Sequence, residues 1–163
     1  MSSSPQVEID LGMQDFAVDS ARAALLIVDI QERLAAAMPL ADLETCQRNV
    51  IVLIELARRL KMPVVVSEQY PKGLGPTTAR LERALAPLGD AVTRFEKLDF
   101  GCTNAPPFAR VFEIVGRSQW VVTGMETHVC VYQTARGLVG RGATTHVVRD
   151  AVCSRVAVNR DVG

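Results

Sequence analysis

The sequence predicts an α/β fold of three layers, an α/β/α sandwich in which a central parallel sheet lies between helices. The apolar runs Ala23–Val28 and Val64–Val66 contain no alternating polar residues, which is typical of strands buried on both faces of a parallel sheet. Segments with helical spacing separate these runs, and such alternation favours a parallel sheet. The length of 163 residues suits one domain.

The helices and strands of the first half are predicted from the spacing of apolar residues and from the residues that end each element. Ala23–Val28 is the first strand and ends at an aspartate. Leu40–Leu60 is predicted to be a helix, because its apolar residues recur at helical spacing and basic residues occupy its last turn. Pro63 ends this helix before the second strand, Val64–Val66. Pro and Gly residues make Glu68–Pro76 a predicted loop.

The second half continues the alternation of strands and helices, and a glycine-containing turn ends its longest helix. In chain order we predict a helix at Thr78–Ala86, a strand at Ala91–Phe95, a loop at Phe100–Pro107, a helix at Phe108–Val115, a strand at Trp120–Thr123, a helix at Glu126–Val139 and a strand at Thr144–Val148.

The two ends of the chain differ from this pattern. We predict that residues 1–20, which are polar and weakly patterned, form a surface tail, and that residues 21–163 form the domain. Residues 154–161 resemble the start of another helix, and the sequence ends at Gly163. Truncation and disorder are both consistent with this ending, and a last helix and strand would then be missing from the sheet.

Composition excludes several classes of partner. The 18 basic and 18 acidic side chains give a formal net charge of +0, so no basic surplus attracts nucleic acid or an anionic membrane. No run approaches the ~18 apolar residues of a membrane span, and the N-terminus lacks the features of a signal peptide. The 4 cysteines are irregularly spaced, which predicts reduced thiols and a cytoplasmic protein. The 2 histidines fit no zinc pattern, and we predict neither metal nor cofactor.

Ligands of open parallel sheets bind beyond the carboxyl ends of the strands. The residues that follow predicted strands are therefore the candidates for chemistry: Asp29, Glu68, Lys97, the segment Gly124–Cys130, and Asp150. A carboxylate, an ammonium group and a thiol from three strand ends would converge on one pocket.

Cys130 is the strongest candidate for a reactive residue, because it falls in the first turn of the predicted helix after the fourth strand. A helix N-terminus contributes about 0.3–1 kcal/mol, and ~2 kcal/mol when partly buried, which lowers a thiol pKa by at most roughly 1.5 units. Strong activation needs a cation as well, and Lys97 is the cation at a strand end. The alternative is a buried, inert cysteine, the commonest fate of a free thiol.

The other candidates also have structural alternatives. Asp29 ends an apolar run and needs a partner such as Lys97, although aspartate is also common as a turn cap. Lysine side chains are mostly solvated, and Glu68 would either line the pocket or face water. His128 lies near the helix N-terminus, where a lone histidine is a weak base candidate, and we interpret His146 as a hydrogen-bonded structural histidine. Trp120 and Phe112 are interpreted as core residues.

Three motifs in the same order resemble the isochorismatase-like cysteine hydrolase family. Leu25–Gln31 is similar to the first-strand motif that ends in the catalytic Asp, and Phe95–Lys97 to the segment that supplies the catalytic Lys. Val121–Ala135 is similar to the nucleophile motif, and Gly142–Ala151 to the strand that follows it. The resemblance covers residues 23–154, most of the chain.

The resemblance implies a Rossmann-like sheet and a triad in which Asp29 takes the thiol proton of Cys130 and Lys97 stabilises the anions. Cys130 would attack the carbonyl of a small amide or carbamoyl compound and form a thioester that water hydrolyses. A cis peptide would join Met125 to Glu126, and the N–H groups of Glu126 and Cys130 would form an oxyanion hole. The family also implies a homo-oligomer, a dimer or a tetramer.

Departures from the family narrow the expected activity. Isochorismatases proper lack the nucleophilic cysteine, so amide hydrolysis is favoured over vinyl-ether hydrolysis. Nicotinamidases of the family hold a metal with histidines after the second strand, and residues 67–75 contain no histidine. These residues instead resemble family members without a defined substrate. A partly apolar pocket is predicted around Glu68, Tyr70, Phe100 and Thr127.

Two alternatives stay open at this point. One is a catalytically silent domain of the same fold that binds a ligand or takes part in an assembly, although the three catalytic residues argue against it. The other is redox chemistry at Cys130, with Cys102 or Cys153 as a second thiol because both flank strand ends.

Overall fold

The computed structural model describes residues 16–163. The predicted surface tail, residues 1–20, therefore lies mostly outside the described residues, and only its last five residues are covered. Of these, residues 16–19 are exposed. Asp19 attaches this segment to the sheet, because its N–H donates to the Gln119 Oε1 over 2.8 Å.

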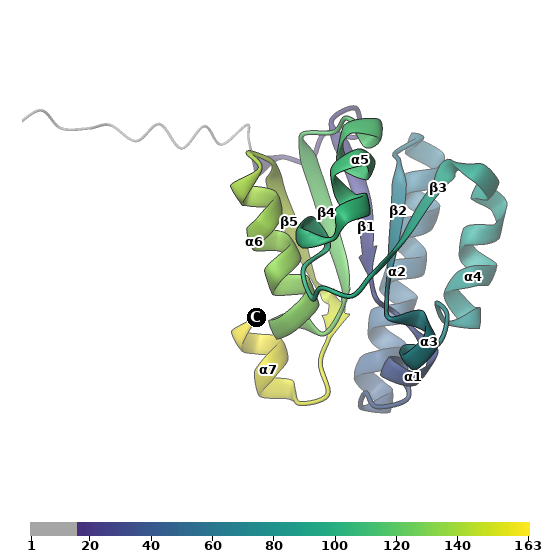
Figure 1. The fold of residues 1–163 in the computed structure, drawn as a ribbon. Helices are drawn as coiled ribbons and strands as arrows, with labels where there is room; N and C mark the ends of the chain where they lie inside the picture. Colours follow the sequence, from purple (N-terminus) through teal and green to yellow (C-terminus); the bar gives the residue numbers. More distant parts are fainter. Residues whose placement is uncertain (1–15) are drawn as a thin grey trace, which may run out of the picture.

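A five-stranded sheet in the order β3-β2-β1-β4-β5 forms the centre of the molecule (Figure 1). All four strand pairs are parallel, as predicted. The strands are β1 (Ala23–Val28), β2 (Val64–Gln69), β3 (Val92–Lys97), β4 (Gln119–Met125) and β5 (Thr144–Cys153).

Helices cover both faces of the sheet and complete the predicted three layers (Figure 1). The long helix α2 and the shorter α4 lie on the far face in this view, and α5 and α6 lie on the near face. The α-helices are α1 (Glu32–Ala35), α2 (Leu40–Leu60), α3 (Pro71–Leu74), α4 (Ala79–Leu85), α5 (Pro106–Val115), α6 (Tyr132–Gly140) and α7 (Ala157–Val162). Two 3-10 helices, η2 (Ala86–Ala91) and η3 (Cys102–Asn104), and one π-helix, η4 (Thr127–Val131), complete the described elements.

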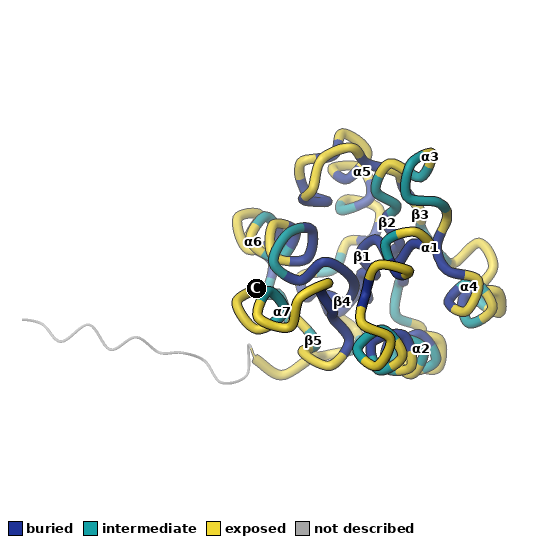
Figure 2. The backbone as a smooth tube through the Cα atoms, turned by 90° about the horizontal axis from the view of Figure 1, so that it is seen from below, coloured by how far each residue is buried: buried dark blue, intermediate teal, exposed yellow. Residues whose placement is uncertain are grey.

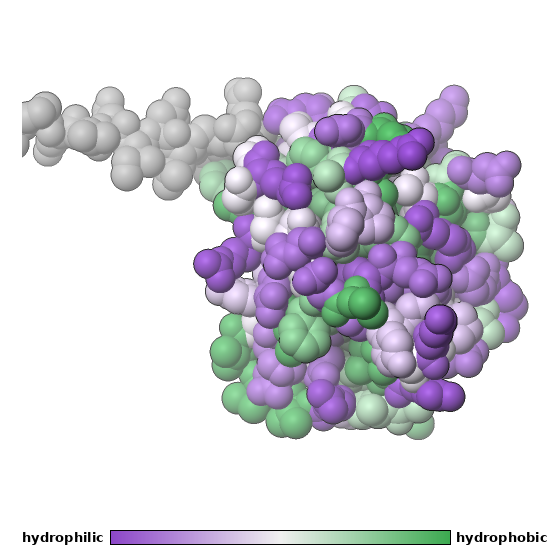
Figure 3. Space-filling view, in the orientation of Figure 1, coloured by the Kyte–Doolittle hydropathy of each residue, from purple (hydrophilic) through white to green (hydrophobic). Residues whose placement is uncertain are grey.

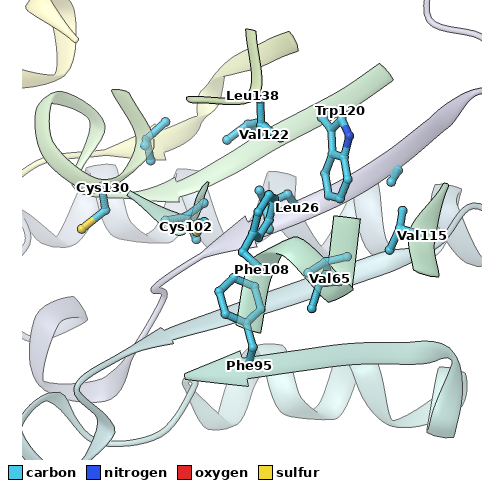
Figure 4. Close-up of a cluster of buried hydrophobic side chains, with 14 of the residues drawn as sticks. Leu26, Val65, Phe95, Cys102, Phe108, Val115, Trp120, Val122, Cys130 and Leu138 are labelled. Carbon is cyan, nitrogen blue, oxygen red and sulfur yellow. The ribbon is translucent and has the colours of Figure 1, made fainter. Parts of the chain in front are cut away.

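Two apolar clusters, one on each face, hold the layers together. The near cluster contains Phe108 from α5 and Trp120 from β4, both fully buried, with ring centroids 5.9 Å apart (Figure 4). The interpretation of Trp120 as a core residue is confirmed, and Phe112, which is partly buried, packs against this core and stacks on Trp120 at 5.6 Å. The far cluster packs Ile54 of α2 and Leu81 of α4 against the other side of the sheet.

Several strands are longer than the sequence predicted. β2 extends to Gln69 and β3 to Lys97, so Glu68 and Lys97 belong to the strands. β5 runs to Cys153, and the prediction that Asp150 follows this strand is wrong. Arg149 and Asp150 interrupt the apolar pattern but face solvent, which an edge strand allows because only part of its surface is buried. The predicted loop at Glu68–Pro76 contains the short helix α3.

Gly124 allows a close approach between the two central strands. A Cβ at this position would lie 2.0 Å from the Val28 carbonyl oxygen, and its φ of 128° is a conformation that favours glycine. The pairing of β4 with β5 shifts register between Val122 and Gly124. Gly124 therefore lets the end of β4 lie close beside the end of β1, its neighbour in the sheet (Figure 2).

The surface seen in Figure 3 is mostly hydrophilic, with hydrophobic side chains in smaller groups. Leu98 and Phe100, in the segment that crosses this face after β3, are 76% and 56% exposed. Among residues 16–163, no helix combines the length and the apolar character that a membrane crossing requires.

Candidate active site

Asp29 directly follows the last residue of β1, and its side chain lies in the interior of the molecule. Its φ of 53° is left-handed, a conformation that aspartate adopts more readily than most residues, and its side chain is fully buried. Burial raises the pKa of the Asp29 carboxyl, while Lys97 and Ser67 act in the opposite direction. The carboxylate is therefore a stronger base than an exposed aspartate, and it is held by fixed donors.

Lys97 reaches from the end of β3 across β2 to this carboxylate. Its Nζ lies 2.6 Å from Asp29 Oδ2, and both side chains are fully buried. The same Nζ also donates to Gln69 Oε1 at 2.8 Å and to the carbonyl of Phe100 at 2.9 Å. Protein acceptors thus surround the ammonium group, so the carboxylate and the cation form one rigid, nearly neutral unit.

Cys130 lies on the π-helix η4 directly after β4, and its thiol is close enough to Asp29 for the charge of that carboxylate to raise the thiol pKa. The Glu126 carbonyl accepts from the N–H groups of Val129 and Val131. The cysteine is only 6% exposed. A carboxylate, an ammonium group and a thiol from the ends of β1, β3 and β4 therefore meet at one place.

The thiol of Cys130 differs from the activated thiolate that the sequence suggested. Burial, followed by the negative charge of Asp29, raises its pKa to about 12, although Lys97 acts the other way. The helix N-terminus and the lysine do not outweigh these effects. Because the resting sulfur is protonated at neutral pH, any nucleophilic attack requires a base, and Asp29 is within reach to serve as one.

The turn before Cys130 is held by the last residues of β5 and those after it. The peptide bond between Met125 and Glu126 is cis. Ser154 Oγ accepts from the Thr127 N–H at 3.1 Å, and the Arg155 guanidinium lies 2.6 Å from Glu126 Oε1. Although burial opposes it, Arg155 holds the pKa of the Glu126 carboxyl below its usual value. Sequence reasoning missed both Ser154 and Arg155, which show no motif of their own.

The four predicted pocket residues do not all line the cavity beside Lys97. Glu68 Oε1 accepts from both the N–H and the hydroxyl of Thr77, so this side chain organises a loop. Tyr70 lines a cavity of about 540 Å3 beside Lys97 together with Leu98, whereas Phe100 and Thr127 do not line it. Thr127 is buried, and its Oγ1 has no hydrogen-bond partner in residues 16–163.

The cysteines separate into two pairs on opposite faces of the sheet. Cys102 and Cys130 belong to the near cluster and lie at one end of it in Figure 4. Cys46 and Cys153 belong to the far cluster. The expectation that Cys153 could approach Cys130 is therefore wrong, because β4 and β5 lie between the two clusters. All four are free thiols.

The histidines lie away from the carboxylate and the ammonium. His128 Nδ1 is 3.4 Å from Ser154 Oγ. The interpretation of His146 as hydrogen-bonded is wrong, because its buried Nε2 has no partner among residues 16–163 and lines a mainly apolar cavity behind α2. Within the same residues, no group of three or more His, Cys, Asp and Glu side chains could hold a metal ion.

Known proteins share this arrangement of strands and helices. A family model described as Isochorismatase domain matches residues 23–162. Isochorismatase domain-containing protein 1 of Danio rerio is 39% identical over 141 residues, which are 86% of this chain and 47% of that protein. The chain spans about half the length of the curated relatives it matches.

Two solved structures extend the comparison. The MAR1 ribonuclease of Caenorhabditis elegans is similar at a TM-score of 0.76 and 35% identity, over 89% of this chain and 71% of that chain. The YcaC gene product of Escherichia coli, described as an octameric hydrolase of unknown specificity, has a TM-score of 0.78 at 23% identity, over 89% of this chain and 70% of that chain. The second likeness is one of fold.

Proposed function

The chain belongs to the isochorismatase domain family, and on that premise we propose that it is a cysteine hydrolase of small amide or carbamoyl compounds. One observation carries the proposal: the Asp29 carboxylate lies 2.6 Å from the Lys97 ammonium and close enough to the Cys130 thiol for its charge to raise the pKa of that thiol. Base, nucleophile and cation are the three groups that an acyl transfer to sulfur requires.

The reaction begins with proton transfer from the Cys130 thiol to Asp29, while the sulfur attacks the carbonyl carbon of the substrate. Lys97 remains paired with the carboxyl group. The N–H groups of Glu126 and Cys130 donate to the tetrahedral oxyanion. Met125 supplies the carbonyl side of the cis peptide that orients the first donor.

Collapse of the tetrahedral intermediate breaks the C–N bond. The leaving amine takes the proton from Asp29, and the acyl group remains on Cys130 as a thioester. Water then gives a proton to Asp29 and attacks the thioester, the C–S bond breaks to release the acid, and Asp29 returns the proton to the Cys130 sulfur. The high pKa of the thiol supports this cycle, because the sulfur is reprotonated at each turnover and Asp29 begins each turnover ionised.

A panel of small neutral amides and carbamoyl compounds tests this function. We expect release of amine or ammonia and a transient acyl adduct on Cys130 in intact-mass spectra of the wild-type protein. Cys130→Ala should abolish both signals, whereas Cys46→Ala, a buried thiol of the far cluster, should retain both. Binding of a panel member without adduct or turnover would instead favour the silent ligand-binding domain.

We also propose that the whole protein is a homo-oligomer, a dimer or a tetramer. Val52, Leu56 and Leu60 support this, because they recur every four residues on α2 and are 60%, 46% and 46% exposed. Light scattering after gel filtration tests the mass, and Leu56→Glu should lower it if α2 is the contact.

The domain boundary and the compartment remain proposals as well. We propose one hydrolase domain over residues 21–163, supported by the family match over 23–162. A cytoplasmic location is supported by the four cysteines, which are free and buried. Fractionation of cells that express the full-length protein tests the location.

A further inference from the structure

A buried serine links the carboxylate of the site to a second thiol. The Ser67 hydroxyl, at 0% exposure on β2, donates to Asp29 Oδ1 over 2.7 Å. The Cys102 thiol, also at 0% exposure, donates to the Ser67 Oγ over 3.4 Å. Neither Ser67 nor Cys102 is the nucleophile, the base or the cation, and neither is exposed to solvent.

The direction of each hydrogen bond follows from the number of protons available. Asp29, paired with Lys97, is an ionised acceptor, so the single hydroxyl proton of Ser67 points to it. The Ser67 oxygen is then free to accept the Cys102 S–H. Since Lys97 donates to Oδ2 and Ser67 to Oδ1, each carboxylate oxygen has its own donor. The two donors fix the plane of the carboxylate.

We propose that Ser67 is a positioning residue that keeps Asp29 ionised and oriented toward the Cys130 thiol, and that Cys102 orients Ser67 as its donor. This inference rests on the proposed function, in which Asp29 is the base. A hydrogen bond to the charged form of a carboxyl favours that form, so Ser67 opposes the effect of burial on Asp29. Chains of hydrogen bonds strengthen one another, and the Cys102 donor therefore strengthens the bond from Ser67.

This role explains Cys102 better than redox chemistry does. Burial raises the pKa of the Cys102 thiol to about 11, so it is protonated at neutral pH. Its proton is donated to Ser67, and its N–H donates to Thr134 Oγ1 at 2.9 Å. The titratable groups that surround Asp29 are Lys97 from β3, Cys102 from η3 and Cys130 from η4.

The test follows the alkylation rate of Cys130 by iodoacetamide across pH, resolved by mass spectrometry on the full chain. On the acidic side of this profile the alkylation rate rises with pH. This rise, the acid limb, reports the first deprotonation of the coupled Asp29 and Cys130 pair. Ser67→Ala removes a bond to the charged carboxylate, so we expect the limb to move to higher pH by about one unit. Ser67→Thr keeps a hydroxyl and should restore the wild-type limb.

Two further variants complete the test: one removes the donor to Ser67, and the other is a control. Cys102→Ala acts through Ser67 without touching Asp29, and should move the limb in the same direction by less. Thr123→Val also removes a buried hydroxyl, but one that bonds the Leu26 carbonyl at 3.3 Å, so its limb should stay in place. Ser67→Ala and Thr123→Val profiles that coincide would overturn the inference.

Asp29→Asn separates this inference from the proposed function. If Asp29 is the base, the limb of this variant becomes that of the Cys130 thiol alone and moves away from its wild-type position, and a Ser67→Ala profile that does not move then refutes only the positioning role. If the limb of Asp29→Asn coincides with that of the wild type, the proposed function and the inference fall together.

Discussion

Lys97 Nζ and Asp29 Oδ2 lie 2.6 Å apart, and neither side chain is exposed to solvent. Such a pair is costly to break, because the partner that remains is a buried charge without compensation. The pair therefore dominates both the chemistry of the site and its response to mutation and pH.

Lys97→Met is expected to abolish turnover and to lower the free energy of unfolding by about 3–5 kcal/mol at neutral pH. The pKa of the Asp29 carboxyl, already raised by burial, rises further without the cation. A raised folded-state pKa gives stability that is present below the unfolded pKa and lost as pH rises, so the deficit should grow from acidic to neutral pH. Urea unfolding at several pH values measures it.

The double variant Lys97→Met/Asp29→Asn is the matched control. It removes both charges and should recover most of the lost stability while remaining inactive. A double variant as unstable as Lys97→Met would show that packing, not charge, is the cause.

Asp29→Asn is expected to change catalysis and thiol ionisation in opposite directions. Loss of the base should lower kcat by about 10²–10⁴-fold. The Cys130 pKa should fall from about 12, because the negative charge of Asp29 helps to raise it and Lys97 remains. More thiolate should then form at neutral pH, measured by its ultraviolet absorbance. Parallel loss of thiolate and turnover would contradict the assigned base.

Gly124→Ala should destabilise the protein by more than about 3 kcal/mol, because the new Cβ would meet the Val28 backbone and the residue would keep a strained φ. Gly140→Ala is the control, since a Cβ there meets nothing within 4 Å and alanine favours a helix. Thermal unfolding compares the two. Equal melting temperatures would refute the close approach of β1 and β4.

Arg155→Ala tests whether the end of β5 orders the nucleophile turn. The Arg155 side chain is 59% exposed, so its ion pair with Glu126 should contribute no more than about 1 kcal/mol to stability. We expect kcat to fall about tenfold with little change in the melting temperature, as a positioning role implies. Arg94→Ala, which breaks the exposed pair with Glu82, should change neither quantity appreciably.

The bounds of the central elements were predicted best where a periodic apolar pattern is followed by a residue that ends a helix or a strand. β1 and α2 have the predicted bounds, because an aspartate follows one and Pro63 follows the other. β5 was predicted too short, because Arg149 and Asp150 do not continue an apolar run on an edge strand. Periodicity therefore identifies strands buried on both faces better than half-exposed ones.

The candidate site was predictable only where it coincides with strand ends and family motifs. Asp29, Lys97 and Cys130 meet both conditions. Ser67, Ser154 and Arg155 also lie at or just after strand ends, but no catalytic motif contains them, because their roles depend on which groups they meet after the sheet has formed. A serine at the end of an apolar run has the same local sequence whether it faces a carboxylate or a backbone carbonyl.

The sheet order also has a consequence for synthesis on the ribosome. β1 is made first, yet its two neighbours are β2 and β4, and the Lys97 partner of Asp29 follows 68 residues later. Until β3 has emerged, the nascent chain therefore contains the apolar segment of β1 and the Asp29 carboxylate without its Lys97 partner. β1 acquires its second neighbour only once Gln119–Met125 has been translated. The central strand β1 is therefore synthesised first, and a long stretch of chain must follow before both of its neighbours in the sheet are available.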